Sequence, residues 1–252
     1  MRIINDLEKK IEIATLEKWF ELCPPEKGEE QWKDLHSAKE MAKFWLNKNN
    51  TNDFLNFIRK VIPNFTYEYI IPELASPFDN FRSPRKHDLC ITEKNTRAIV
   101  TIEGKANESF GTGEFGNCLI EAIKTKYENI NSNAFDRMIN LYLNFFHSNG
   151  SILPIMYQLL YWFAGSILDA IGEDTENIIM VLQEFTSSNT DSKKQIKNHE
   201  DFCRFIEFIT ERKFNDIKNG QIIGPITNKY TSDEKTHVKK LYIGYYSVDL
   251  ME

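Results

Sequence analysis

The segment that most constrains the fold lies between residues 87 and 106, HDLCITEKNTRAIVTIEGKA. It holds two runs rich in β-branched and apolar residues, HDLCITE and RAIVTIEGKA, separated by a short polar stretch. Two such runs at this spacing are typical of an antiparallel hairpin. The run FTYEYIIPE, at residues 65–73, has a similar composition. The sequence therefore predicts a meander of three strands.

A further strand is indicated by NIIMVLQEF, at residues 177–185, which is nearly all apolar between polar neighbours. A short run of this kind suits a central strand buried on both faces. A helical pattern that ends at Gly172 leads straight into it, as in a parallel crossover. With a final strand in KKLYIGYYSVDL, the expected fold class is α/β, a mixed central sheet with flanking helices.

Apolar residues recur at helical spacing in seven further segments. These expected helices are residues 5–22, 38–46, 52–62, 118–130, 134–146, 154–172 and 201–210. The polar stretch TSSNTDSKKQIKN, at residues 186–198, is expected to be a loop. We expect one domain over residues 1–252. It comprises an N-terminal helical extension (1–28), a core (37–185) with a helical insertion (117–146), and a C-terminal helix and strand (186–252).

Composition narrows the classes of protein that this chain can be. With 252 residues, of which 41% are hydrophobic, the chain can bury a sizeable core. It has no apolar run long enough to span a membrane and no secretory signal pattern at its start, so we expect a cytoplasmic protein that does not enter a membrane. Its four cysteines are scattered and form no C-x-x-C, and the pattern indicates no histidine at ligand spacing. We therefore expect neither a zinc site nor a disulfide framework.

The predicted hairpin carries the residues that indicate chemistry. Asp88 begins one strand, and Glu103 and Lys105 end the next, so paired strand ends can bring two carboxylates and one ammonium to one point. Glu103 and Lys105 are two positions apart and leave the same face of a strand. The carbonyl of Gly104 can add a ligand oxygen. Hard oxygen ligands suit Mg²⁺ or Mn²⁺, which act as Lewis acids and lower the pKa of bound water.

Spacing alone is a weak signal, because Glu-x-Lys occurs at Glu8, Glu103 and Glu211 and the other two instances lie in helical segments. A purely structural interpretation also stays open. In that interpretation Asp88 and Lys105 form a partly buried ion pair, and Glu103 is an edge carboxylate.

In its strand context the motif resembles the PD-(D/E)XK, or restriction-endonuclease-like, superfamily. The resemblance covers residues 37–185 and implies a core of helix, three-strand meander, helix and strand. It also implies that Asp88 and Glu103 bind metal and that Lys105 activates water. A further carboxylate would come from Glu40 or Glu73. Gln158, in the helical segment YQLLY, would contact substrate or order the site.

Two neighbouring groups are candidates for substrate contacts. Arg85 and His87 flank the hairpin aspartate and can meet a phosphate, or they belong to an exposed basic turn. Residues 111–116 match G-x-G-x-x-G, which raises dinucleotide binding as an alternative. No strand with a ribose-binding acid follows, and an acid inside the motif would face the phosphates. We therefore expect Gly111 and Gly113 to admit a nucleic-acid backbone, to form a lid, or simply to make a turn.

These observations predict a Mg²⁺- or Mn²⁺-dependent nuclease that cuts DNA or, less readily, RNA, with pairing of two copies left open. The formal net charge of −6 argues against nonspecific coating of nucleic acid. The alternative is a nuclease-like fold without turnover that binds a protein or nucleic acid. The sequence has no H-E-x-x-H, G-x-S-x-G or P-loop motif for other common hydrolytic or transfer chemistries.

Overall fold

The computed structural model describes residues 2–76, 85–93, 98–111, 113–146, 150–232 and 235–250. Within them a mixed sheet of six strands has the order β1-β2-β3-β4-β6-β5. The strands are β1 (Tyr69–Ser76), β2 (Arg85–Glu93), β3 (Ala98–Lys105), β4 (Asn177–Thr186), β5 (Gln221–Ser232) and β6 (Lys235–Asp249). Strands β1 to β3 are antiparallel, β3, β4 and β6 are parallel, and β5 is antiparallel to β6. The predicted α/β class, the meander and the parallel crossover are confirmed.

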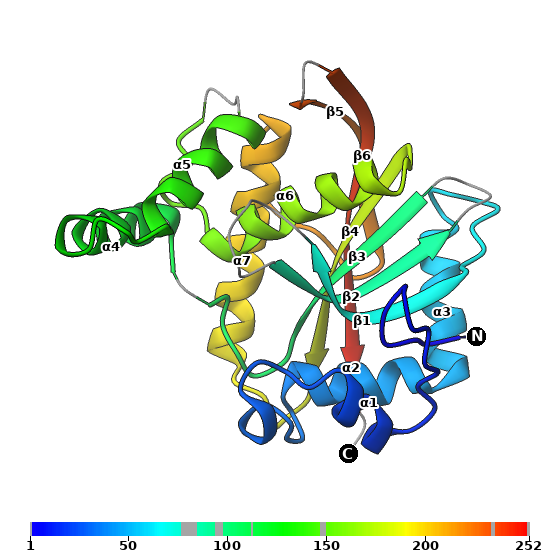
Figure 1. Ribbon diagram of the computed structural model, residues 1–252. Helices are drawn as coiled ribbons and strands as arrows, with labels where there is room; N and C mark the ends of the chain where they lie inside the picture. Colours follow the sequence, from blue (N-terminus) through cyan, green and yellow to red (C-terminus); the bar gives the residue numbers. More distant parts are fainter. Residues whose placement is uncertain are drawn as a thin grey trace.

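Helices cover both faces of the sheet (Figure 1). On one face, α1 (Leu16–Leu22), α2 (Ser37–Leu46) and α3 (Lys48–Ile58) share a core with the strands. On the other, α6 (Tyr157–Gly172) and α7 (Ser192–Thr210) form a second core, which α5 (Ala134–Phe145) also joins. The helix α4 (Phe115–Glu128) extends away from the sheet beside α5 (Figure 1). A short 3-10 helix, Gly28–Glu30, lies between α1 and α2.

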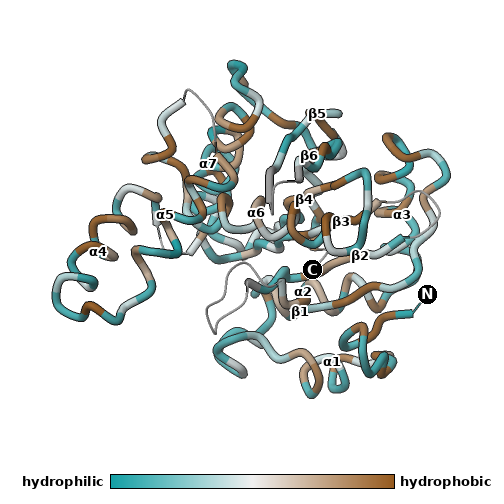
Figure 2. The backbone as a smooth tube through the Cα atoms, turned by 45° about the horizontal axis from the view of Figure 1, so that its top comes forward, coloured by the Kyte–Doolittle hydropathy of each residue, from teal (hydrophilic) through white to brown (hydrophobic). Residues whose placement is uncertain are grey.

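The central strands are apolar because each serves both cores. All positions of β3 are buried, and alternate side chains face opposite layers. Val100 and Ile102 join the core of α1–α3, whereas Ile99 joins the core of α6 and α7. Figure 2 shows hydrophobic residues gathered on β3 and β4 in the middle of the molecule.

None of the helices within the described residues is long and apolar enough to cross a bilayer.

The N-terminal segment differs from the expected helix over residues 5–22, because only Leu16–Leu22 is helical. Before it, isolated bridges join Ile3 to Ile70 of β1 and Ile4 to Glu12. Ile3 and Ile4 are at most 1% exposed. Burial against the edge of the sheet therefore overrides the helical spacing of this segment, and the expected helical extension is helical only at its end.

Two further differences lie in the C-terminal third. Helix α7 begins at Ser192, so part of the expected polar loop is helical, and the Asp191 side chain caps it by accepting from the amides of Lys193 and Lys194. Strand β5 had not been expected. It contains Gly224 and Pro225 beside a register shift between Ile223 and Ile226, which is tolerated because β5 is an edge strand.

Candidate active site

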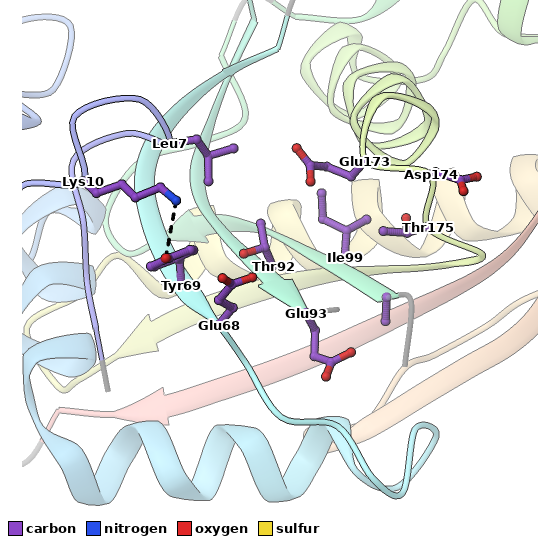
Figure 3. A pocket seen from close by; sticks show the side chains of 11 residues that line it. Leu7, Lys10, Glu68, Tyr69, Thr92, Glu93, Ile99, Glu173, Asp174 and Thr175 are labelled. Atoms are coloured by element: carbon purple, nitrogen blue, oxygen red, sulfur yellow. Dashed lines mark hydrogen bonds between the residues drawn. The ribbon is translucent and has the colours of Figure 1, made fainter. Parts of the chain in front are cut away.

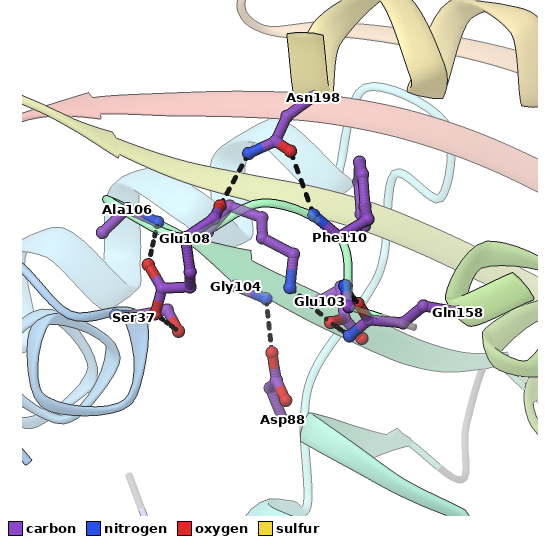
Figure 4. A network of polar contacts seen from close by, with 11 residues as sticks. Ser37, Asp88, Glu103, Gly104, Ala106, Glu108, Phe110, Gln158 and Asn198 are labelled. Carbon is purple, nitrogen blue, oxygen red and sulfur yellow. Dashed lines mark hydrogen bonds and ion pairs between the residues drawn. The ribbon is translucent and has the colours of Figure 1, made fainter. Parts of the chain in front are cut away.

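The candidate site lies where β2 separates from β3. Pairing between these strands ends at Leu89 and Ile102, whereas β3 stays paired with β4 as far as Lys105 and Glu184. Residues 103–105 therefore have no main-chain pairing with β2. Instead, the amide of Gly104 donates to a side chain of β2, Oδ2 of Asp88, at 2.7 Å (Figure 4). At the end of the β2–β3 pairing, a carboxylate thus takes the place of a main-chain hydrogen-bond acceptor.

Glu103 lies at the centre of a chain of polar contacts. Lys105 Nζ donates to Glu103 Oε1 at 2.9 Å, and these side chains are only 5% and 1% exposed. The side-chain amide of Gln158, on α6, donates to the same oxygen. Gln158 Oε1 in turn accepts from the amide of Gly111 at 2.7 Å (Figure 4). Lys105 Nζ also lies 5.1 Å from the centre of the Phe110 ring. Gln158 therefore orients Glu103 and ties the glycine loop to it.

The protonation of this group follows from burial and charge. Burial and the nearby Glu103 carboxylate raise the pKa of Asp88 to about 8, although Lys105 opposes this effect. For Lys105, burial lowers the pKa, but Glu103 and Asp88 outweigh it and raise the pKa above its usual value. Lys105 is therefore a permanent cation at neutral pH, and Asp88 holds a proton there unless another positive charge enters the site.

A third carboxylate, Glu108, was not singled out by the sequence. Its Oε1 accepts from the amide and hydroxyl of Ser37 at 2.8 and 2.6 Å, and its Oε2 accepts from the amide of Ala106 at 3.0 Å. Burial opposes ionisation, but these bonds and the Lys105 charge lower the pKa of Glu108. Because Ser37 begins α2, Glu108 fixes this helix against the end of β3.

Asn198, on α7, holds the other side of the same loop. It is fully buried; its Nδ2 donates to the carbonyl of Glu108 at 2.9 Å, and its Oδ1 accepts from the amide of Phe110 at 3.1 Å (Figure 4). Nothing in the sequence indicates this role, because Asn198 lies in the polar stretch expected to be a loop. The loop after β3 is therefore held by α2, α6 and α7 together.

These groups line a cleft of about 800 Å³. Its walls combine aromatic rings with charged groups, and the carboxylates (Glu26, Glu73, Asp88, Glu103 and Glu108) outnumber the ammonium groups (Lys86 and Lys105). Glu73, one of the expected ligands, has a φ of 51°, and Lys86 Nζ lies 3.6 Å from its Oε2. A cleft in which carboxylates outnumber ammonium groups is chemically suited to a divalent cation.

Glu40, the other expected carboxylate, is not among the residues that line the cleft. Its Oε1 accepts from the amide of Leu35 and from Lys43 Nζ, each at 2.9 Å, and the residue is 3% exposed. Glu40 thus stabilises the start of α2. Its position gives no support to a role in metal binding.

His87 also lies away from the cleft. It is 0% exposed, and its Nε2 lies 2.8 Å from Oδ2 of Asp169 on α6. The usual alternation along β2 is broken here, because Leu89, two positions on, faces the opposite core. A side chain buried against a carboxylate does not favour the expected phosphate contact. The side chain of Arg85 lies outside the described residues.

The glycine loop, residues 111–116, makes main-chain hydrogen bonds to other parts of the protein. The amide of Gly111 donates to Gln158, and the carbonyl of Gly113 accepts from the amide of Tyr157 at 2.9 Å. Gly111 lines the cleft, whereas Gly113 is not among its lining residues. At the start of α4 the N-cap residue is Glu114, and an acid there disfavours a bound pyrophosphate. The loop therefore supports α6 and borders the cleft.

A smaller pocket, of about 400 Å³, lies at the other end of β3 (Figure 3). Acidic side chains, among them Glu68, Glu93 and Glu173, share its lining with Tyr69. Lys10 Nζ donates to the hydroxyl of Tyr69 at 3.4 Å. Among the described residues, this pocket has no lysine paired with a buried carboxylate in the way that Lys105 is paired with Glu103 in the cleft. The residues that the sequence predicts to bind metal and activate water, Asp88, Glu103 and Lys105, line the larger cleft and not this pocket.

Comparison with known proteins adds one finding. A family model described as a domain of unknown function matches residues 12–249. No curated protein and no solved structure matches the chain.

Proposed function

Since the chain belongs to the family DUF6946, a domain of unknown function, we propose its activity from the chemistry of the cleft. The protein is a Mg²⁺- or Mn²⁺-dependent nuclease that hydrolyses phosphodiester bonds of DNA or, less readily, RNA. One observation carries the proposal: Asp88, Glu103 and Lys105 line the same cleft where β2 parts from β3, and Lys105 contacts Glu103. The same observation supports a likeness to the PD-(D/E)XK nucleases.

The donor set suits a hard divalent cation. Asp88 and Glu103 would hold it, with Glu73 as a further carboxylate in the same cleft. The bound cation would supply Lewis acidity and a more acidic water. It would also offset the burial and the nearby Glu103 charge, which together raise the pKa of Asp88.

Lys105 has a different task from the carboxylates. Because its pKa is raised above the usual value, it is a poor proton acceptor at neutral pH. It would orient the attacking water and stabilise the charge that develops on the phosphoryl oxygens. Gln158 would act by holding Glu103, since it donates to the oxygen that Lys105 also contacts.

The direct test measures cleavage of plasmid, linear and single-stranded DNA and of RNA with Mg²⁺ or Mn²⁺. We expect Lys105→Ala to lower the rate by at least about 100-fold, the usual scale for losing one charged group in such a site. The matched control is Lys124→Ala, because the Lys124 side chain is 61% exposed on α4. Unchanged cleavage by a folded Lys105→Ala protein would refute the proposal.

The second candidate is a noncatalytic binding protein. It is favoured by the Glu103–Lys105 ion pair, which is complete without a cation. Calorimetry with Mn²⁺ separates the two. A nuclease site should bind the ion with an affinity that Asp88→Asn lowers at least tenfold. A binding protein should give no heat that depends on Asp88.

A further inference from the structure

We propose a second metal site, for Zn²⁺ or a similar ion with affinity for thiolate, formed by His199, Cys203 and Asp216. One ligand atom from each of these residues lies within 4.8 Å of the other two. His199 and Cys203 lie on α7, and Asp216 lies in the connector between α7 and β5. The site is separate from the carboxylates of the cleft and does not depend on the proposed nuclease function.

The backbone already places the three side chains for one ion. His199 and Cys203 are four positions apart on a helix, so they project from the same face. Asp216 Oδ1 lies 2.8 Å from His199 Nε2. Ligand bonds of about 2.0–2.3 Å around tetrahedral zinc place neighbouring ligand atoms about 3.3–3.8 Å apart. Side-chain rotation suffices to reach this spacing, because the Asp216 side chain is 57% exposed.

The donor types select the class of ion. A sulfur, a nitrogen and a carboxylate oxygen are together typical of zinc, whereas Mg²⁺ prefers oxygen alone. Cys203 is a free cysteine and is only 6% exposed. Burial around the sulfur would protect a metal–thiolate bond from water and oxidants.

A buried carboxylate close to the cluster has one oxygen that makes no hydrogen bond within the described residues. Glu184, at the carboxyl end of β4, is 3% exposed, and its Oε1 has no hydrogen-bond partner among the described residues. Its other oxygen, Oε2, accepts from the hydroxyl of Tyr245 at 2.5 Å. The Tyr245 ring packs edge-on against His199, with the ring centres 5.1 Å apart. A divalent cation at His199 would compensate this carboxylate.

The position suggests what the ion does for the protein. It would tie α7 to the connector that leads into β5, and it would bind next to Asn198. Asn198 holds the loop after β3 through Glu108 and Phe110. Zinc would therefore stabilise α7, the helix that holds the loop bordering the cleft.

Cobalt spectroscopy tests the proposal, because Co²⁺ replaces Zn²⁺ and reports thiolate ligation in its absorption. We expect the reduced, chelator-treated protein to bind one equivalent of Co²⁺ with a thiolate-to-cobalt charge-transfer band, which Zn²⁺ displaces. Asp216→Asn should weaken Co²⁺ binding at least tenfold, and Cys203→Ser should abolish the band. Cys118→Ser is the matched control, since Cys118 is a cysteine outside the cluster.

Further controls separate this site from the cleft and from misfolding. Asp88→Asn should leave the cobalt band unchanged, whatever it does to cleavage. Asp216→Asn alters an exposed side chain and should fold even if the change at buried Cys203 does not. Absence of a saturable band in the wild-type protein, a band that persists in Cys203→Ser, or binding that Asp216→Asn leaves unchanged would each overturn the proposal. The cluster would then be an ion pair beside a thiol.

Discussion

Replacement of Asp88 by Asn should stabilise the metal-free protein at alkaline pH. Asp88 has a pKa of about 8 in the folded protein, against its ordinary value of 3.8. Between these values the unfolded chain loses a proton that the folded protein retains. The stability that Asp88 contributes is therefore greatest below about pH 4 and is lost as the pH rises towards 8. Asn, which is neutral, removes this dependence while its side-chain oxygen can still accept from Gly104.

The size of the effect follows from the same pKa. At about 1.4 kcal/mol for each pH unit, the full displacement corresponds to at most about 6 kcal/mol. Because Asp88 is only partly buried by its neighbours, solvent screening reduces this, and we expect a gain of about 2–3 kcal/mol for Asp88→Asn at pH 8. At pH 4 the variant and the wild-type protein should be nearly equal.

A divalent cation should remove most of this difference in stability. At a Mn²⁺ concentration about 100-fold above its dissociation constant, binding stabilises the wild-type protein by about 2.7 kcal/mol. Asp88→Asn should gain much less, because it has lost a ligand. Urea unfolding at pH 4, 6 and 8, with EDTA or with Mn²⁺, measures all of these free energies.

Asp53→Asn is the matched control, because Asp53 is exposed on α3. Its free energy of unfolding should change little at any of these pH values. A free-energy difference between Asp88→Asn and the wild-type protein that is the same at pH 4 and pH 8 would refute the reasoning about charge. Equal stabilisation of both proteins by Mn²⁺ would refute the assignment of Asp88 as a ligand.

Two further substitutions test how the site is held. Asn198→Ala should lower the free energy of unfolding by about 2–4 kcal/mol, since one buried and one partly buried backbone group lose their partner. Chemical denaturation measures it, and a loss below about 0.5 kcal/mol would contradict the described role. Gly104→Ala should cost about 1–3 kcal/mol, because its Cβ would lie 2.8 Å from the sulfur of Met41. The double variant with Met41→Ala should cost less than the sum of the single variants, and simple additivity would exclude this contact as the cause.

The sheet was largely predictable from the sequence because its central strands are buried on both faces. Burial forces β3 and β4 to be continuous apolar runs, and the helix before β4 dictates a parallel crossover. The edges were not predictable in the same way. Ile3 pairs with Ile70, far away in the sequence, and Ile4 pairs with Glu12 across a turn. Strand β5 contains Gly224 and Pro225, which are typical of turns and do not indicate a strand. Such choices depend on tertiary contacts, which local periodicity does not record.

The same distinction holds for the site. Asp88, Glu103 and Lys105 lie at the ends of recognisable strands, so hairpin geometry predicts that they share one region, and all three line the same cleft. Glu108 and Asn198 act through partners far away in the chain, and nothing in the local pattern indicates those partners. The His199–Cys203 spacing was overlooked because the expected boundary between loop and helix fell between these two residues. Only the earlier start of α7, at Ser192, puts both on one helical face.

The early end of the β2–β3 ladder also affects which substitutions the protein can tolerate. Up to Ile102, a side chain on β3 must fit a neighbour on β2 as well as two cores. Beyond Ile102 the first of these demands disappears, and residues 103–111 answer to helices α2, α6 and α7 instead. Residues 103–105 remain paired with β4, so only residues 106–111 lie outside every strand pairing. Changes at residues 106–111 can therefore alter the border of the cleft without disturbing strand registration.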